Sequence, residues 1–262
     1  MEKKKIENQN NQERKYALSV RNIGKVFQSA DIKHPQIKNG CFQALDNISF
    51  DILENDLCII AGANGAGKTL LMSIIAGLEK ASAGEIFLRG RAGLIFQDAD
   101  AQILGETPSE DIAFGPKNLD LSENEIAKRI QSSLLYCGLS DKADFPARFL
   151  SGGEKKKLAI AGITAMGADI IIFDEPYSNL DYPSVCLINN LIAKLKKDGK
   201  TVIVLTHEIE KILALSNQMI ILHKGLLVFN GDSREALSCD LERWAIKNPL
   251  YSYKKFEDLI WI

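Results

Sequence analysis

The sequence lacks any apolar run long enough to cross a membrane. A spanning helix needs about 18 or more consecutive apolar residues, whereas the longest runs, at 170–173, 202–205 and 219–222, have the length of strands. A secretory signal is missing too, because residues 1–18 are charged and rich in amides, without an apolar centre. We therefore expect a soluble intracellular protein with a disordered tail over residues 1–17.

Paired cysteines and an excess of positive charge are also lacking. The five cysteines are widely separated and show no C-x-x-C spacing, which argues against a disulfide framework or a zinc site. A formal net charge of −2 excludes a broad basic surface that holds nucleic acid by its phosphates, so no nucleic-acid partner is expected. What remains is ordinary globular composition, 46% hydrophobic and 25% charged, in 262 residues. That length suits one large domain with an appendage.

Short apolar runs alternate with helical patterns through most of the chain. Strand-like runs occur at 57–61, 93–96, 170–174 and 202–206. This alternation predicts an α/β fold with a largely parallel sheet. Residues 48–52 alternate apolar and polar side chains, which predicts a strand with one face exposed.

Two other segments have different patterns. Residues 107–149 contain no strand-like run, and Ser122 and Glu125 form a capping-box pattern ahead of apolar residues at helical spacing. We expect a helical insertion there. Residues 218–229 predict a β-hairpin that turns at 224–225.

Residues 62–69 match the phosphate-loop pattern G-x-x-x-x-G-K-[ST], between a predicted strand and a helical pattern. Glycines let successive backbone N–H groups close around phosphate oxygens, while Lys68 supplies a cation and Thr69 a hydroxyl for Mg²⁺. A glycine-rich turn that binds nothing is the alternative, and the flanking strand and helix disfavour it. We expect a nucleoside triphosphate to be bound by Gly62, Asn64, Gly65, Ala66, Gly67, Lys68, Thr69 and Leu70.

Acidic and hydroxyl groups stand at the ends of two other elements. Asp174 and Glu175 either simply terminate a buried strand or, beside the phosphate loop, place one carboxylate near Mg²⁺ and the other near the attacking water. Ser151 and Glu154 form a capping box ahead of a helix. With the two glycines between them, the same helix N-terminus is also an anion site.

Together these motifs resemble the ATP-binding-cassette (ABC) ATPases over residues 18–231. The resemblance implies an α/β P-loop NTPase fold with a RecA-like core, an antiparallel β subdomain and a helical subdomain at about 105–155. A short C-terminal extension would follow at 232–262. The matching positions, in family order, are the phosphate loop at 62–69, Gln97, the signature at 150–154, Asp174, Glu175, Asp181 and His207.

The same resemblance implies a head-to-tail dimer, with a second cassette, that holds ATP at its seam. Ser151, Gly152 and Gly153 of one cassette would face the nucleotide of the other, and Asp181 would cross the interface. Phe27 best matches the aromatic residue that stacks on adenine, with a core phenylalanine as the alternative.

An ATPase activity is implied as well, with roles for individual residues. Glu175 would act as general base, His207 would contact the γ-phosphate, Gln97 would sense the nucleotide state, and Lys68 would complete the catalytic set. For His207 alone, a core histidine is the alternative. The residues that would hold Mg²⁺ are Thr69, Gln97 and Asp174.

Residues 97–102 and 110–116 resemble one branch, the ATPase components of cobalt-type and energy-coupling-factor importers. This implies uptake of a vitamin or a transition-metal ion such as cobalt. An integral membrane subunit would dock between Gln97 and Glu110, which puts the chain on the cytoplasmic face of the cell membrane. Acidic side chains in this stretch would suit a basic helix of that subunit, and a solvated acidic loop is the alternative.

Two rival functions fit part of the pattern. An exporter ATPase is opposed only by residues 97–116 and the C-terminal tail. A soluble ABC ATPase acting on nucleic acid or ribosomes is opposed by the single uninterrupted cassette and the near-neutral charge.

Two further alternatives remain open from the sequence. The second cassette is either a copy of this chain or a paralogue. C-terminal aromatics such as Trp244 either pack on the chain's own body or contact a partner.

Overall fold

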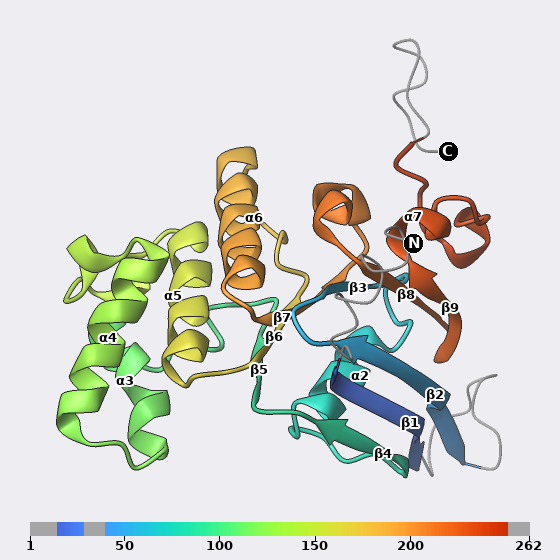
Figure 1. Cartoon of the computed structure of the whole chain (residues 1–262), viewed down its shortest axis with the longest axis horizontal. Coiled ribbons are helices and arrows are strands. Elements are labelled where there is room, and N and C mark those ends of the chain that lie inside the picture. The colour runs from blue at the N-terminus through green and yellow to red at the C-terminus, as the bar shows by residue number, and fades with distance from the viewer. Residues whose placement is uncertain (1–14, 29–39, 251–262) are drawn as a thin grey trace, which may run out of the picture.

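A six-stranded sheet forms the centre of the computed structural model, which describes residues 15–28 and 40–250 (Figure 1). Five neighbouring strands are parallel, and the sixth is the antiparallel arm of a hairpin. The predicted parallel sheet and hairpin are confirmed, with the strand expected at 93–96 shifted by one residue. In spatial order the strands are β5 (Ala92–Ile95), β6 (Ile170–Asp174), β7 (Thr201–Thr206), β3 (Leu57–Ala61), β8 (Gln218–His223) and β9 (Leu226–Asp232).

Both faces of β6 are covered, which explains its unbroken apolar sequence. Ile170 and Ile172 pack in one core and Ile171 and Phe173 in another, because successive side chains of a strand point to opposite faces. Asp174 is the last residue of β6. It lies at the same edge of the sheet as the end of β3, since both strands run parallel to β7 between them.

One face of this sheet carries α2 (Lys68–Ile75) and a second, antiparallel sheet of three strands (Figure 1). The strand order in the second sheet is β2 (Cys41–Leu53), β1 (Tyr16–Gln28) and β4 (Ala83–Leu88). These strands and α2 share a core with the inward residues of the central sheet. The helix that follows the phosphate loop is therefore packed between two sheets.

Two predictions concern the second sheet. Residues 48–52 bury their three apolar side chains and expose Ser49, which confirms the half-exposed strand. The expected end of the disordered tail is too late, because Tyr16 and Ala17 belong to β1, and Ala17 is buried by pairing and packing. Residues 1–14 lie outside the described part of the chain.

Helices cover the other face of the central sheet, and three of them gather beyond its β5 edge (Figure 1). The predicted helix after Ser122 is confirmed: the Ser122 hydroxyl accepts from the Glu125 amide, and Gly138 ends the helix in a left-handed conformation. The helices are α3 (Pro108–Asn118), α4 (Glu123–Cys137), α5 (Gly152–Ala165) and α6 (Tyr182–Lys197), with single turns η1 (Ser140–Lys142) and η2 (Ala147–Phe149) before α5.

The remaining described elements lie after β7. Trp244 packs against Leu241 and Ile246 in the same core as the helices, so this aromatic packs on the chain's own body. The other C-terminal aromatics, in 251–262, lie outside the described residues. The short elements are η3 (Ile209–Lys211), η4 (Leu213–Leu215), α7 (Ser233–Ala236) and η5 (Glu242–Trp244).

Candidate active site

The loop between β3 and α2 is a cradle of backbone at the carboxyl edge of the sheet. Gly62 has no room for a side chain, because an added Cβ would lie 2.3 Å from the carbonyl oxygen of Leu222. Gly67 precedes α2 with a φ of 101°, a left-handed conformation that favours glycine. The loop therefore presents backbone N–H groups and the positive end of α2, an arrangement suited to a phosphate.

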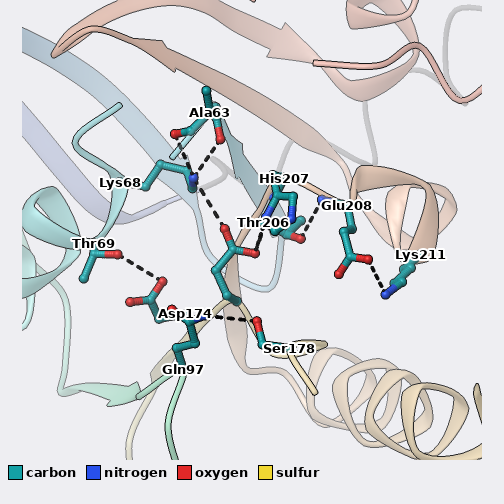
Figure 2. Close-up of polar contacts among 12 residues, drawn as sticks. Ala63, Lys68, Thr69, Gln97, Asp174, Ser178, Thr206, His207, Glu208 and Lys211 are labelled. Carbon is teal, nitrogen blue, oxygen red and sulfur yellow. Dashed lines mark hydrogen bonds and ion pairs between the residues drawn. The ribbon is translucent and has the colours of Figure 1, made fainter. Parts of the chain in front are cut away.

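Lys68 is the buried cation of this site, with 6% of its surface exposed. Its Nζ donates to the carbonyl oxygens of Gly62 at 2.7 Å and Ala63 at 3.3 Å, and lies 3.4 Å from Glu175 Oε1 (Figure 2). A buried charge needs partners. The ammonium is held over the loop by the loop's own backbone and by the carboxylate that follows β6.

Thr69 and Asp174 form a second polar pair. The Thr69 hydroxyl lies 3.2 Å from Asp174 Oδ1 and donates to it (Figure 2). Burial raises the pKa of Asp174, while the Thr69 hydrogen bond and the Lys68 charge lower it. Because burial disfavours the carboxylate, a cation bound at these two oxygens would stabilise its charged form. Hydroxyl and carboxylate oxygens are ligands that Mg²⁺ accepts.

Glu175 is held in an unusual conformation. Its φ is 43°, and its amide donates to the Leu205 carbonyl at 2.9 Å. Such backbone costs about 1–3 kcal/mol and is concentrated at functional sites. Oε2 lies 3.0 Å from His207 Nδ1, whereas Oε1 is buried and has no hydrogen-bond partner. His207 is half exposed, so the core-histidine alternative is wrong.

Gln97 follows β5 at the rim of this group. Its side-chain amide donates to the Ser178 hydroxyl at 3.2 Å (Figure 2). The Ser178 amide in turn donates to the Glu175 carbonyl. Within the described residues, the Gln97 amide has no hydrogen bond to Thr69 or Asp174. The structure thus places Gln97 beside the turn that leads to α6.

Ser151 begins α5 with a complete capping box, as predicted. Its hydroxyl accepts from the Glu154 amide at 3.3 Å, and the Glu154 carboxylate accepts from the Ser151 amide at 2.8 Å. Glu154 also forms an ion pair with Lys142 of η1. This second bond ties the start of α5 to the preceding turn.

The glycines of the signature face the start of α6. A Cβ added to Gly152 would meet only Leu180, at 3.8 Å, whereas one added to Gly153 would lie 3.0 Å from the Ser184 hydroxyl. In the described part of the chain, no hydrogen bond links this segment to the chain's own loop at 62–69. The helix N-terminus is therefore available to a ligand that comes from elsewhere.

Substitution of Glu154 distinguishes the stabilising effect of its bond to Lys142 from that of its bond to the Ser151 amide. The Lys142 hydrogen bond and then the Ser151 amide lower the pKa of Glu154 from its usual 4.5 to about 2. This stabilisation is present above about pH 4.5 and is lost as pH falls toward 2. Glu154→Gln keeps the capping bond, so we expect a loss of less than about 1 kcal/mol at neutral pH.

Urea unfolding of Glu154→Gln and Glu154→Ala at pH 7 tests this. The alanine variant loses both bonds, and we expect it to be about 1 kcal/mol less stable than the glutamine variant. The difference between the glutamine variant and the wild type should shrink as pH falls below about 4.5. A gap that widens in acid would contradict the assignment of the lowered pKa.

Most of the remaining predicted residues have exposed or capping positions. Phe27, near the end of β1, is 41% exposed and has the Lys25 ammonium 5.0 Å from its ring centroid, so it is not a core residue. Asp181 caps α6 by accepting from the Ser184 amide at 3.0 Å. Hydrogen bonding to the Ser184 side chain, and then to this amide, lowers the pKa of Asp181. In the loop itself, Asn64 and Gly65 are exposed, Ala66 is buried and Leu70 is half-buried.

Lys156 is a residue of this region that the motifs did not single out. Only 4% exposed, it donates from Nζ to the Gln97 carbonyl at 2.8 Å. Its position on α5 gave a signal, because Ile160 and Ile163 follow at helical spacing and are buried on the same side. The run of three lysines after Glu154 hid it among solvated charges.

The negative charge expected near Gln97 is offset in part by lysines of α5, while Glu106 and Glu110 are exposed. Asp100 forms an ion pair with Lys155, and the Lys156 ammonium interacts with Asp98. Apolar side chains are exposed here too: Phe96, Leu104 and Phe114 are 37%, 68% and 46% exposed, respectively. The surface next to Gln97 therefore carries both acidic and apolar side chains.

The residues fit a nucleotide and Mg²⁺. Glycine backbone, a buried ammonium and a helix N-terminus meet the needs of a triphosphate, and the buried, unpartnered Oε1 of Glu175 lies beside them. No group of three His, Cys, Asp or Glu residues suited to a metal is found among the described residues. Mg²⁺ bound with a nucleotide does not require one, because phosphates and water supply most ligands. These features define a P-loop ATPase.

Comparison with known proteins identifies the family. Residues 45–178 match the family described as ABC transporter. The chain is 37% identical over 230 residues to the energy-coupling factor transporter ATP-binding protein EcfA of Carboxydothermus hydrogenoformans, covering 82% of this chain and 85% of the relative. The chain belongs to the ABC transporter ATPase family.

Solved structures support the same placement. The structure of cbiO1 from Clostridium perfringens, part of the ABC transporter complex cbiONQ, has a TM-score of 0.74 and 29% identity, covering 85% of this chain and 91% of that chain. An ATP-binding cassette solved as a dimer in a post-hydrolysis state with ADP and Pi has a TM-score of 0.70 and 27% identity, covering 83% and 99%. The predicted fold class and ATPase activity are confirmed.

The length and composition of the helices determine whether any of them could span a membrane. No helix in residues 15–28 and 40–250 is long and apolar enough to span a bilayer.

Proposed function

We propose that this chain is the ATP-hydrolysing subunit of an importer of the energy-coupling-factor type, which takes up a vitamin or a transition-metal ion such as cobalt through separate membrane subunits. The family membership supports the ATPase part. The names of similar proteins support the importer part: the relative from C. hydrogenoformans is an energy-coupling factor component, and the C. perfringens neighbour is part of cbiONQ. No feature of the described residues favours an exporter or a nucleic-acid ATPase over this assignment.

Glu175 carries the proposed chemistry. One of its carboxylate oxygens is tied to His207 and the other is buried without a hydrogen bond, 3.4 Å from Lys68 Nζ. In the proposed reaction this second oxygen accepts the proton of the attacking water, while His207 orients the carboxylate and contacts the γ-phosphate. Lys68 stabilises the negative charge of the phosphates.

Thr69, Asp174 and Gln97 are the proposed Mg²⁺ ligands. Thr69 and Asp174 already lie at hydrogen-bond distance, whereas the Gln97 side chain bonds Ser178 and has to turn away from it. When bound, Mg²⁺ neutralises charge on the β and γ phosphates. Gln97 thus reports on nucleotide by exchanging Ser178 for Mg²⁺ as its partner. Phe27, which is half exposed, is the proposed platform for adenine.

The signature of a second cassette completes each site in this proposal. Ser151, Gly152 and Gly153 stand at the N-terminus of a 14-residue helix, whose dipole favours an anion. They have no hydrogen bond to their own phosphate loop in the described residues, and the similar dimeric cassette holds ADP and Pi. Asp181, which caps α6 beside them, lies on the proposed interface.

The stretch between Gln97 and Glu110 is the proposed docking site for the membrane subunit. The Leu104 amide is held by Asp111 of α3, so Leu104 and Phe114 belong to one rigid corner. An apolar corner next to Gln97 would let a membrane protein influence the position of the Gln97 side chain. The chain would then work peripherally, at the cytoplasmic face of the membrane.

Capture of a membrane subunit tests this docking. We expect Leu104→Asp to reduce co-purification with membrane proteins encoded beside this gene at least about tenfold, because a charge enters an apolar contact. Leu135→Asp on α4 is the matched control, since Leu135 is 73% exposed and outside the proposed surface. Equal loss in both variants, or in neither, would contradict the proposed surface, while ATP hydrolysis by both variants would leave the ATPase assignment intact.

A further inference from the structure

Lys156 is a buried cation that the proposed mechanism does not use. It lies in the second turn of α5, whose first turn carries the signature, and its Nζ donates to the main-chain carbonyl of Gln97 at 2.8 Å. Burial lowers the pKa of Lys156, whereas the negative charges of Asp174, Asp98 and Glu175 raise it. The ammonium therefore links α5 directly to the main chain at Gln97.

A buried ammonium is retained only where its surroundings compensate for lost hydration. Here the compensation comes from one carbonyl and from several carboxylates, rather than from a single salt bridge. Removal of the charge would leave the Gln97 carbonyl without this donor.

A second lysine of α5 holds the same loop. Lys155 forms an ion pair with Asp100, three residues after Gln97. Both lysines, with Gln97, Asp100 and the turn at 178–180, line a cavity of about 300 Å³. The loop that carries Gln97 is thus attached to α5 at two points, while the Gln97 side chain bonds Ser178 of that turn.

We propose that Lys156 is a positioning residue that couples the signature helix to Gln97, so that the Gln97 side chain reaches the Mg²⁺ site only when α5 is correctly placed. The inference rests on the proposed role of Gln97 and adds the connection that controls it. Because Lys156 holds the main chain at residue 97, a shift of α5 moves that backbone and leaves Thr69 and Asp174 on their own elements. The signature at 151–153 and the loop that carries Gln97 then move together.

Steady-state ATP hydrolysis by the full-length chain tests this coupling. Lys156→Met keeps the length of the side chain and removes the charge, and we expect kcat to fall about tenfold with KM for ATP changed less than about twofold. Lys156→Arg restores a donor and should keep activity within about threefold of wild type. Lys157→Met is the control on the same helix, since the hydrogen bond of Lys157 goes to the Gly138 carbonyl at the end of α4 and not to the Gln97 loop.

A double-mutant cycle separates positioning from loss of structure. In a Gln97→Ala background, Lys156→Met should cost less than about twofold, because the side chain through which it acts is gone. An equal cost in both backgrounds, or a fall in activity that follows only a lowered melting temperature, would overturn the inference. If Gln97→Ala alone leaves hydrolysis unchanged, the role of Gln97 fails and the coupling fails with it. A wild-type chain that binds but does not hydrolyse ATP would instead overturn the proposed reaction.

Discussion

Glu175→Gln is expected to abolish ATP turnover and to leave ATP binding intact. The substitution keeps the shape of the side chain and a donor or acceptor for His207, but the amide cannot take a proton from water. General-base catalysis typically contributes about 10²–10⁴-fold, so kcat should fall by at least about a hundredfold. Binding should survive, because Lys68 and the loop backbone are unchanged and Lys68 keeps its bonds to Gly62 and Ala63.

The measurement pairs phosphate release with equilibrium binding of ATP. Glu208→Gln is the matched control, because Glu208 lies one residue after His207 and pairs with Lys211 away from the active site (Figure 2). We expect this control to keep its turnover. Turnover that survives in Glu175→Gln would remove Glu175 from the role of base, and loss of ATP binding in that variant would mean that its charge, through Lys68, is needed to form the site.

Much of this site is local in the sequence and could be predicted from it. The phosphate loop needs glycine where backbone is crowded or left-handed, as at Gly62 and Gly67, and these positions appear in one run of residues. The capping box at Ser151 spans four residues and forms as expected. The strand before Asp174 is buried on both faces, so its composition alone identifies it.

Other features depend on contacts between distant segments, and the sequence did not reveal them. The Lys68 and Glu175 pair, the Gln97 and Ser178 hydrogen bond and the His207 contact join segments that follow different strands. Their order in a family pattern indicated a shared site without indicating which side chains touch. Lys156 is an example of what the sequence cannot indicate. A lysine within a run of lysines is normally solvated, and Lys156 is buried because it packs against the loop that carries Gln97.

The pairing of Asp100 in the acidic stretch beside Gln97 could not be predicted for the same reason. Counting charges along the loop places several acidic groups together, but Asp100 meets Lys155 from a helix that begins fifty residues later. Charge along one segment does not determine the field at its surface, because oppositely charged side chains come from elsewhere in the fold. The exposed Leu104 and Phe114 become visible as a surface only after folding.

Two inactive variants should restore activity to each other if each site is shared between chains. Lys68→Met removes the cation of the phosphate loop and keeps the apolar stem. Gly152→Asp puts a carboxylate at the start of α5, where it repels the partner's γ-phosphate, and it fits because an added Cβ meets only Leu180 at 3.8 Å. We expect each variant alone to lose at least about a hundredfold in ATPase activity, since both act on charge stabilisation of the phosphates.

In a mixed dimer of these variants, the loop of the Gly152→Asp chain faces the intact signature of the Lys68→Met chain. One site of two is then complete, while the other carries both changes. Random mixing in equal amounts should return about a quarter of wild-type activity in a two-fold dimer whose sites work independently. As a control, the Lys68→Met chain mixed with a chain that carries both substitutions forms no complete site and should stay inactive. No recovery in the first mixture, with dimers present, would contradict a site shared between two copies of this chain, whereas activity of Gly152→Asp alone would remove the signature from the site.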